Sequence, residues 1–281
     1  MGLGTMFKAN KAYRAQQKGN SAEAMRLFEE CFQEGLADPR YLLSYAVLLI
    51  RDGQYQKAKD LLVKYQKAPG MTADQRVTLI VDYAACCYKL GDLDKGVSKL
   101  EEMFRKHPSG LIYQTLGYLY VEQFDASRKA AFLAKETEEQ EPADPAAVLI
   151  AQEQGEEVPL TPEDKWEAGR QKALKFNQDA VEYDDEDAIC LDNLAQTWYR
   201  VMGDRAEAKQ WFEKAHAIKP EQIDTLYFLS RYDLEAGNTA AAAEKLEKAL
   251  EGRFSTLNYC NKADMEAELT ALKGKCGGRS E

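Results

Sequence analysis

The chain has 281 residues, a net charge of -10 and a charged fraction of 30%. The surplus of acidic side chains repels nucleic-acid phosphates, and no apolar run approaches the roughly 18 to 20 residues that a membrane-spanning helix needs. The start of the chain also lacks the basic segment and apolar core of a secretory signal. We therefore expect a cytoplasmic protein that binds neither nucleic acid nor membrane.

The residue types that carry out most catalysis are sparse. No two of the six cysteines have the two-residue separation typical of zinc and redox sites, and there are only two histidines, His107 and His216. Glycine-rich phosphate loops, His-Glu-x-x-His motifs and nucleophilic serine elbows are all missing from the sequence. The pattern predicts reduced, mostly buried thiols, no metal or cofactor, and no enzymatic activity.

In chain order, the first predicted elements are helical hairpins that recur at a fixed period. Gly19 and Gly53 are 34 residues apart, and Gly91 follows after a longer interval whose excess lies in the turn-rich stretch 68–72. Each glycine is followed at the same offsets by three residues that suit a packed helix face: Ala24-Phe28-Cys31, Ala58-Leu62-Tyr65 and Gly96-Leu100-Met103. A glycine permits the positive φ of a tight turn, and small residues seven apart lie on one face of a helix.

A long acidic insertion, residues 125–169, interrupts the fourth hairpin. It contains twelve acidic and four basic residues, and the next helix with suitably spaced small residues is the one with Ala173 and Ala180. Within the insertion we expect a helix over 126–140, a turn over 142–146 and an apolar segment over 146–151. Thr161, followed by a proline and two acids, predicts a helix start, because a hydroxyl caps the helix and acids favour its positive end. The insertion is interpreted either as a solvated loop or as a segment that regulates or extends the binding surface.

The last two hairpins repeat the pattern and carry a family resemblance. Gly203 and Gly237 are again 34 residues apart, and Ala208, Phe212 and Ala215 correspond to Ala242, Leu246 and Ala249. Together with Tyr113, Leu116-Gly117 and Tyr120 in the fourth unit, and Pro220 at the end of the fifth, the chain resembles the tetratricopeptide repeat (TPR) family. Lys11-Ala12 in the first unit departs from the family pattern. The resemblance implies paired antiparallel helices in which these aromatic and small residues form the core.

The C-terminal region predicts one further helix over 261–272, with Met265, Leu269 and Leu272 on the side that covers the last repeat. The predicted fold is all-α: a right-handed α-solenoid of about six TPR hairpins with a C-terminal capping helix. Its expected divisions are 5–124 for units 1–3 and the first helix of unit 4, 125–169 for the insertion, 170–254 for the remaining units, and 255–281 for the cap and tail.

The resemblance also implies a binding surface, since in this family the first helix of each hairpin lines a concave groove. The groove-facing candidates are Tyr13, Arg40, Arg51, Tyr88, Lys89, Tyr118, Asn193, Arg200, Tyr227 and Arg231. Interleaved tyrosines and arginines suit an acidic or carboxylate-ended peptide, because arginine binds a carboxylate through two parallel hydrogen bonds. The same residues also fit the ordinary surface of soluble helices.

The predicted function is that of a scaffold that binds a peptide or protein partner in this groove. One alternative is self-regulation, in which the acidic insertion occupies the groove until a partner displaces it; a less favoured alternative is an enzyme with an unrecognised site. The family's clamp for chaperone tails is not expected, because its five binding positions are occupied by Ala9, Tyr13, Ser44, Thr78 and Asp82, and none of these matches.

Overall fold

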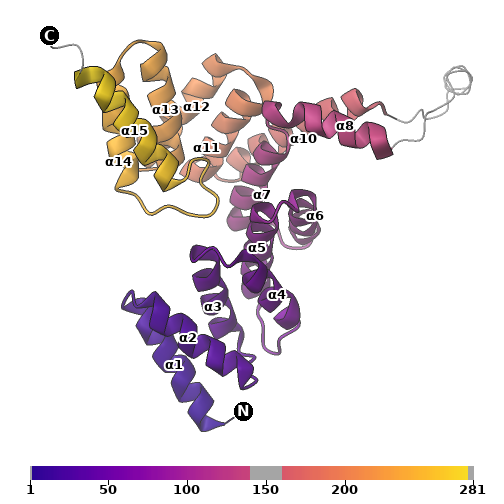
Figure 1. The fold of residues 1–281 in the computed structure, drawn as a ribbon. Coiled ribbons are helices and arrows are strands. Elements are labelled where there is room, and N and C mark those ends of the chain that lie inside the picture. Colours follow the sequence, from indigo (N-terminus) through magenta and orange to yellow (C-terminus); the bar gives the residue numbers. More distant parts are fainter. Residues whose placement is uncertain (1, 140–159, 278–281) are drawn as a thin grey trace, which may run out of the picture. The chain divides into compact units, whose positions relative to one another are not determined.

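The computed structural model describes residues 2–139 and 160–277, and every regular element within these ranges is a helix (Figure 1). None of the described helices is long and apolar enough to cross a membrane. The chain divides into two compact units. The first contains residues 1–119 and 253–264, and the second contains residues 120–252 and 265–281.

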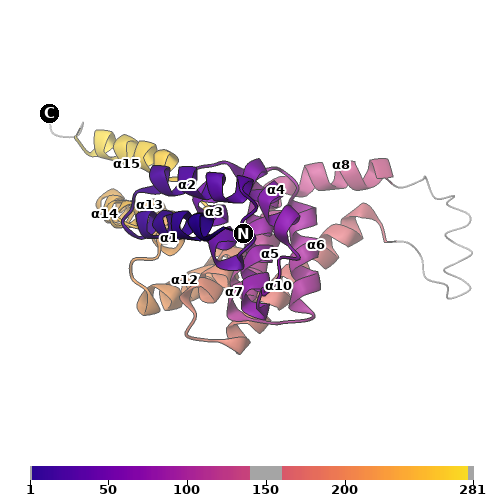
Figure 2. The ribbon, with the colours of Figure 1, turned by 90° about the horizontal axis from the view of Figure 1, so that it is seen from below.

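The first unit is built from three helical hairpins followed by the start of α7 (Gly110–Gln123). The hairpins are α1 (Leu3–Gln17) with α2 (Ser21–Gln33), α3 (Pro39–Arg51) with α4 (Tyr55–Tyr65), and α5 (Ala73–Lys89) with α6 (Leu93–Phe104). Neighbouring hairpins pack through α2 on α3 and α4 on α5, and the first helices also meet, α1 with α3 and α3 with α5. Figure 2 shows α1, α2 and α3 side by side from below. This contact between first helices creates a continuous surface along one side of the unit.

Glycine turns close these hairpins as the period predicts. Gly53 has a φ of 76°, which places it in the left-handed region, and the amide of Gln54 donates a hydrogen bond of 2.8 Å back to the Leu49 carbonyl. Residues that follow the turn, such as Ala58 and Leu62, are completely buried. The small residue lets the neighbouring helix approach and the larger one fills the remaining space.

The second unit contains the insertion and the last two hairpins. Its helices are η1 (Ala126–Arg128), α8 (Lys129–Glu139), α10 (Pro162–Tyr183), α11 (Ala188–Gln196), a π-helical stretch η2 (Thr197–Met202), α12 (Arg205–Ile218), α13 (Ile223–Glu235), α14 (Thr239–Leu250) and, from Met265 onward, α15 (Lys262–Gly277). Phe212 is fully buried and stacks on Phe228 at a centroid distance of 5.0 Å. This stack anchors α12 against α13.

The described part of the insertion is helical. Thr161 caps α10 by accepting a hydrogen bond from the Asp164 amide at 3.1 Å, so the predicted helix start is found in the structure. The helix expected over 126–140 is present as η1 and α8, and α8 packs on α10 through Phe132 and Trp166, whose ring centroids are 5.2 Å apart. The turn expected over 142–146 and the apolar segment over 146–151 lie outside the described residues.

The C-terminal helix α15 packs as its apolar spacing predicts. Met265, Leu269 and Leu272 are buried. An ion pair joins Lys273 to Glu247 on α14 at 2.5 Å. The last repeat is therefore covered by a helix of the same chain, which removes an apolar face from water.

Candidate binding groove

Two adjoining hollows lie along the first helices of the first unit. One, of about 530 Å³, is lined by residues of α3, α4 and α5 together with the segment 253–256. The other, of about 590 Å³, is lined by residues of α1 and α3 and also by Arg253. The hollows share Val47, Arg51 and Arg253, and we call them together the arginine groove. The shared residues make one continuous depression from the end of α1 to α5.

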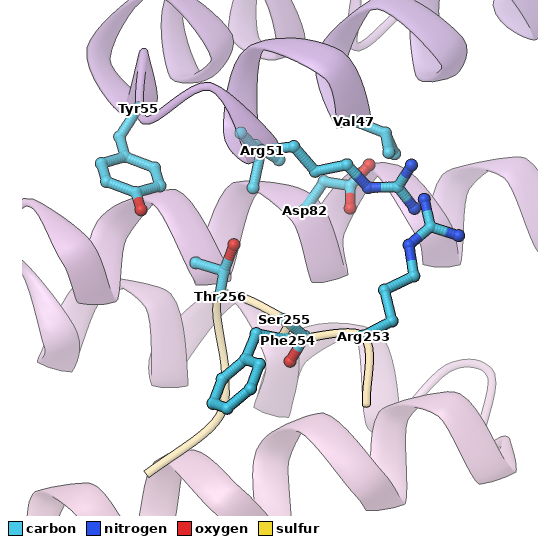
Figure 3. A pocket seen from close by; sticks show the side chains of 9 residues that line it. Val47, Arg51, Tyr55, Asp82, Arg253, Phe254, Ser255 and Thr256 are labelled. Atoms are coloured by element: carbon cyan, nitrogen blue, oxygen red, sulfur yellow. The ribbon is translucent and has the colours of Figure 1, made fainter. Parts of the chain in front are cut away.

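Two arginines meet where the hollows join. Arg51 is the last residue of α3, and Figure 3 shows its guanidinium pointing toward the guanidinium of Arg253. Partial burial, and next the positive charge of Arg253, lowers the pKa of Arg51. Within the described part of the chain, no carboxylate lies within salt-bridge distance of either guanidinium. Like charges held together in this way attract an anion.

Asp82 is the acidic side chain of this groove. It comes from α5 and its carboxyl group lies beside the Arg51 side chain (Figure 3). Its Oδ2 atom is buried and has no hydrogen-bond partner among the described residues. Burial raises the pKa of Asp82 to about 7, although the positive charge of Arg51 acts in the opposite direction. The carboxyl is therefore partly protonated near neutral pH.

The position of Arg253 depends on an irregular segment rather than on a repeat helix. Residues 253–261, between α14 and α15, have no helical structure. A local turn holds this segment, because the Ser255 amide donates to the Asn258 side chain at 2.6 Å and the Leu257 amide donates to the Ser255 hydroxyl at 3.2 Å. The turn orders the backbone next to Arg253, and Ser255 and Thr256 form part of the groove wall.

Solved structures with the same arrangement of helices identify the fold. The thermophilic TPR protein TTC0263 of Thermus thermophilus aligns over 84% of this chain and 99% of its own, with a TM-score of 0.57 and 15% identity. The chain has the tetratricopeptide-repeat fold. PilW, a type IV pilus biogenesis factor, aligns over 95% of this chain and 100% of its own with a TM-score of 0.57 and 12% identity. MamA of Desulfovibrio magneticus, residue 41 to its end, aligns over 79% and 98% with a TM-score of 0.52 and 18% identity.

These similarities lie in the structures, and at such identities they establish the TPR fold alone. No family model matches the sequence, and no curated protein matches it significantly. Within the described residues, no group of three or more histidine, cysteine, aspartate or glutamate side chains is placed to hold a metal ion.

Among the predicted groove residues of the first unit, Arg51 is the one that lines the described hollows. Tyr13 is 42% exposed, and it packs edge to face with Tyr41 at a centroid distance of 6.4 Å. Arg40 forms an ion pair of 3.0 Å with Asp38, the residue that caps α3. Both residues thus make local contacts at α1 and at the start of α3.

The next three predicted residues cluster around the end of α5. Tyr88 and Tyr118 pack edge to face at a centroid distance of 6.1 Å, and the Lys89 ammonium lies 4.8 Å from the Tyr88 ring centre. Tyr118 is buried. These residues form an aromatic cluster that joins α5 to α7 within the first unit.

In the second unit, the predicted groove arginines have protein partners. Arg200 donates from Nε to Asp125 at 2.8 Å, from Nη2 to Glu122 at 2.7 Å and from Nη1 to Gln196 at 2.8 Å, and its side chain is only 6% exposed. Burial opposes ionisation of Asp125, yet the Ser127 hydrogen bonds and the charge of Arg200 together lower its pKa. Arg200 is thus a buried partner of two carboxylates, and a register of helix positions could not reveal this.

The remaining predicted residues of the second unit are also engaged. Asn193 is buried, with 2% of its surface exposed. Arg231 forms an ion pair with Glu268 of α15, and its guanidinium lies 4.3 Å from the Tyr227 ring centre. These contacts tie α13 to the C-terminal helix.

Sequence reasoning missed Arg253 and placed Asp82 only among the unmatched clamp positions. Arg253 follows α14, the last repeat helix, and matches no groove-facing position of the 34-residue register. Asp82 occupies the first helix of the third hairpin, and an acid at that point could have indicated a polar groove residue. No sequence signal places the two beside Arg51.

Proposed function

We propose that this chain is a non-enzymatic protein-interaction scaffold that binds an acidic segment of a partner protein in the arginine groove. The observation that carries the proposal is the pair of guanidiniums, Arg51 and Arg253, which converge in an open hollow where, among the described residues, no carboxylate lies within salt-bridge distance of either. A carboxylate from a partner would relieve their mutual repulsion and accept parallel hydrogen bonds from either guanidinium.

The shape of the groove supports an extended peptide. Two adjoining hollows offer apolar surface from Leu43, Val47 and Ile50 next to polar groups from Gln16 and Ser44. The side-chain Oε1 of Gln16 is buried and has no hydrogen-bond partner among the described residues. The two arginines can bind an acidic residue of a peptide, and the apolar and polar side chains around them can contact the residues on either side of it.

The proposed ligand binds in the first unit rather than in the second. Arg200 and Arg231 of the second unit already pair with carboxylates of this chain, so a ligand would have to compete with Glu122, Asp125 or Glu268 for them. A free peptide carboxylate gains little when it replaces a carboxylate that is already held in place. We therefore assign these two arginines to the stability of the second unit.

The acidic insertion remains the basis of an alternative form of this function, in which it occupies the groove in the absence of a partner. Residues 140–159 are not among the described residues, so the alternative rests on charge complementarity with the arginine groove. Deletion of residues 140–159 leaves α8 and α10 in place. If the insertion competes for the groove, the deletion will increase affinity for an acidic peptide at low salt and much less at high salt.

The direct test is binding of a fluorescein-labelled, C-terminally amidated peptide that carries three glutamates, measured by fluorescence anisotropy. Arg51→Gln and Arg253→Gln should each weaken binding about 10-fold or more, since a hydrogen bond to a charged group contributes roughly 1.5 to 3 kcal/mol. The matched control is Arg76→Gln, which removes the same charge from an exposed position on α5 outside the lining of both hollows.

Two further peptides resolve the ligand. One carries glutamine in place of each glutamate and is also amidated; the other has the glutamines but a free C-terminal carboxylate. Binding of the glutamate peptide identifies an internal acidic segment as the ligand, and binding of the free-carboxylate peptide identifies a chain end. If the wild-type protein binds neither the glutamate peptide nor the free-carboxylate peptide, the groove assignment is wrong. It is also wrong if Arg76→Gln weakens binding as much as Arg51→Gln.

A further inference from the structure

The arginine groove contains an acid where its proposed ligand also presents one. Asp82 lines the same hollow as Arg51 and Arg253, and its buried Oδ2 atom has no hydrogen-bond partner within the described residues. An ionised Asp82 would repel an incoming carboxylate, whereas a protonated Asp82 would offer it a hydrogen bond. The protonation state of Asp82 thus affects how the groove receives a carboxylate.

We propose that Asp82 takes up one proton when an acidic ligand binds, so that protonated Asp82 and the ligand carboxylate share a hydrogen bond between Arg51 and Arg253. The inference rests on the proposed function, because it concerns the same groove and the same carboxylate ligand. Two carboxyl groups that share one site with one proton between them are a stable arrangement, since only one of them then carries the negative charge.

The charge balance of the groove is consistent with this arrangement. Before binding, one carboxyl that is partly ionised faces two guanidiniums. After binding with proton uptake, the two guanidiniums face one ligand carboxylate and one neutral carboxylic acid. The proton comes from solvent and is bound by Asp82, so the site gains one negative charge from the ligand and loses the negative charge of Asp82.

Asp82 is already close to the point at which it binds a proton. Burial raises its pKa to about 7 in the unliganded groove. A second negative charge a few ångströms away raises the pKa of a buried carboxyl further, because the ionised form then meets a like charge. Binding near neutral pH therefore converts a partly protonated Asp82 into a fully protonated one.

Other charged or titratable groups also face Asp82. They come from each element around it: Arg51 from α3, Arg253 from the irregular segment, Tyr55 from α4 and Cys86 from α5 itself. Burial raises the pKa of Cys86 to about 12, so its thiol stays neutral, and arginine stays charged throughout. A change in affinity near neutral pH that depends on this groove thus reports on Asp82.

The affinity should fall as the pH rises. Proton uptake on binding means that each pH unit above the pKa of the free site weakens binding by up to about 10-fold. Between about pH 6 and pH 8.5, we expect the dissociation constant of the glutamate peptide to increase roughly 10-fold or more. Glutamate carboxylates of the peptide titrate near pH 4 and do not contribute in this interval.

The test is a pH series of peptide binding with wild type, Asp82→Asn and the matched control Asp74→Asn, an exposed acid on the same helix. Asparagine cannot ionise, so Asp82→Asn should bind with an affinity that is nearly independent of pH, and near pH 8.5 it should bind about 10-fold more tightly than wild type. Asp74→Asn should keep the wild-type slope. Calorimetry in two buffers with different heats of ionisation measures the proton uptake directly.

The outcomes separate this inference from the function on which it rests. If wild type binds the peptide with no pH dependence, or Asp82→Asn keeps the wild-type slope, proton uptake by Asp82 is refuted while groove binding stands. If no variant binds the peptide at any pH, the proposed function fails and this inference fails with it. An NMR titration of the Asp82 carboxyl carbon in the wild-type protein needs no variant: a midpoint near pH 4 that the peptide leaves unmoved would overturn the proposal.

Discussion

The burial of Asp82 predicts that the stability of the folded protein depends on pH, even without a ligand. In the folded protein, burial raises its pKa to about 7 from an ordinary value of 3.8. The folded state then binds more protons than the unfolded state between these two values. Stability accordingly falls as the pH rises through this window, because ∂ΔG/∂pH has the sign of the protons bound by the unfolded state minus those bound by the folded state.

The substitution Asp82→Asn removes this effect, since an amide resembles the neutral acid and never ionises. Each pKa unit corresponds to about 1.4 kcal/mol, so the shift of Asp82 bounds the gain at roughly 4 kcal/mol above neutral pH. Water in the adjoining hollow screens part of this effect, so we expect about half of this bound, roughly 2 kcal/mol. The difference between variant and wild type should shrink toward about pH 4 and vanish below about pH 3, where Asp82 is protonated in both states.

Urea unfolding followed by far-UV circular dichroism measures this at a series of pH values for wild type, Asp82→Asn and Asp74→Asn. The expected result is a stability difference for Asp82→Asn that grows between about pH 5 and pH 8, with a small and constant difference for Asp74→Asn. If Asp82→Asn is less stable than wild type near pH 8, the ionised carboxylate is stabilised by Arg51 more than burial opposes it, and the reasoning is wrong.

Three further predictions concern the second unit. Phe212→Ala should cost about 3 to 5 kcal/mol in chemical denaturation because the ring is fully buried against Phe228, and a loss below about 1 kcal/mol would contradict its place in the core. Arg200→Ala should cost about 3 to 5 kcal/mol because it leaves two largely buried carboxylates unpaired, and an unchanged unfolding midpoint would show that they stay hydrated. Gly203→Val should cost about 1 to 3 kcal/mol and lower the melting temperature, since φ is 80° there; an unaltered melting curve would argue against the turn.

Local pattern was enough to predict the hairpins. The recurrence of glycines such as Gly53 and Gly203 marks turns with positive φ, and Ala208 with Phe212 marks the buried face of the following helix. The helix start at Thr161 is equally local. The Thr161 hydroxyl accepts a hydrogen bond from the Asp164 amide, and the Asp164 carboxylate accepts one from the Thr161 amide, all within one turn. These features depend on neighbours a few residues away, so a single sequence contains the information that specifies them.

The candidate site was predicted much less well, because charges find partners far along the chain. Arg200 occupies a groove-facing register position, yet its guanidinium binds Asp125, which lies 75 residues earlier. A helical register gives the direction in which a side chain leaves its own helix and carries no information about what another helix places in its path. For Arg51, the sequence predicted a cation in a groove but did not predict that Arg253 and Asp82 lie beside it.

The sequence by itself determined the repeat, its turns, its packing residues and the helix that covers the last hairpin, since each follows from periodicity and from contacts within one or two turns of helix. Only the tertiary structure decided which arginines remain available for a ligand. It buried Arg200 among carboxylates, and it brought Arg253, from the segment after α14, to a hollow that Arg51 and Asp82 also line. Electrostatic partnerships are set by distance in space, and the packing of distant segments sets that distance.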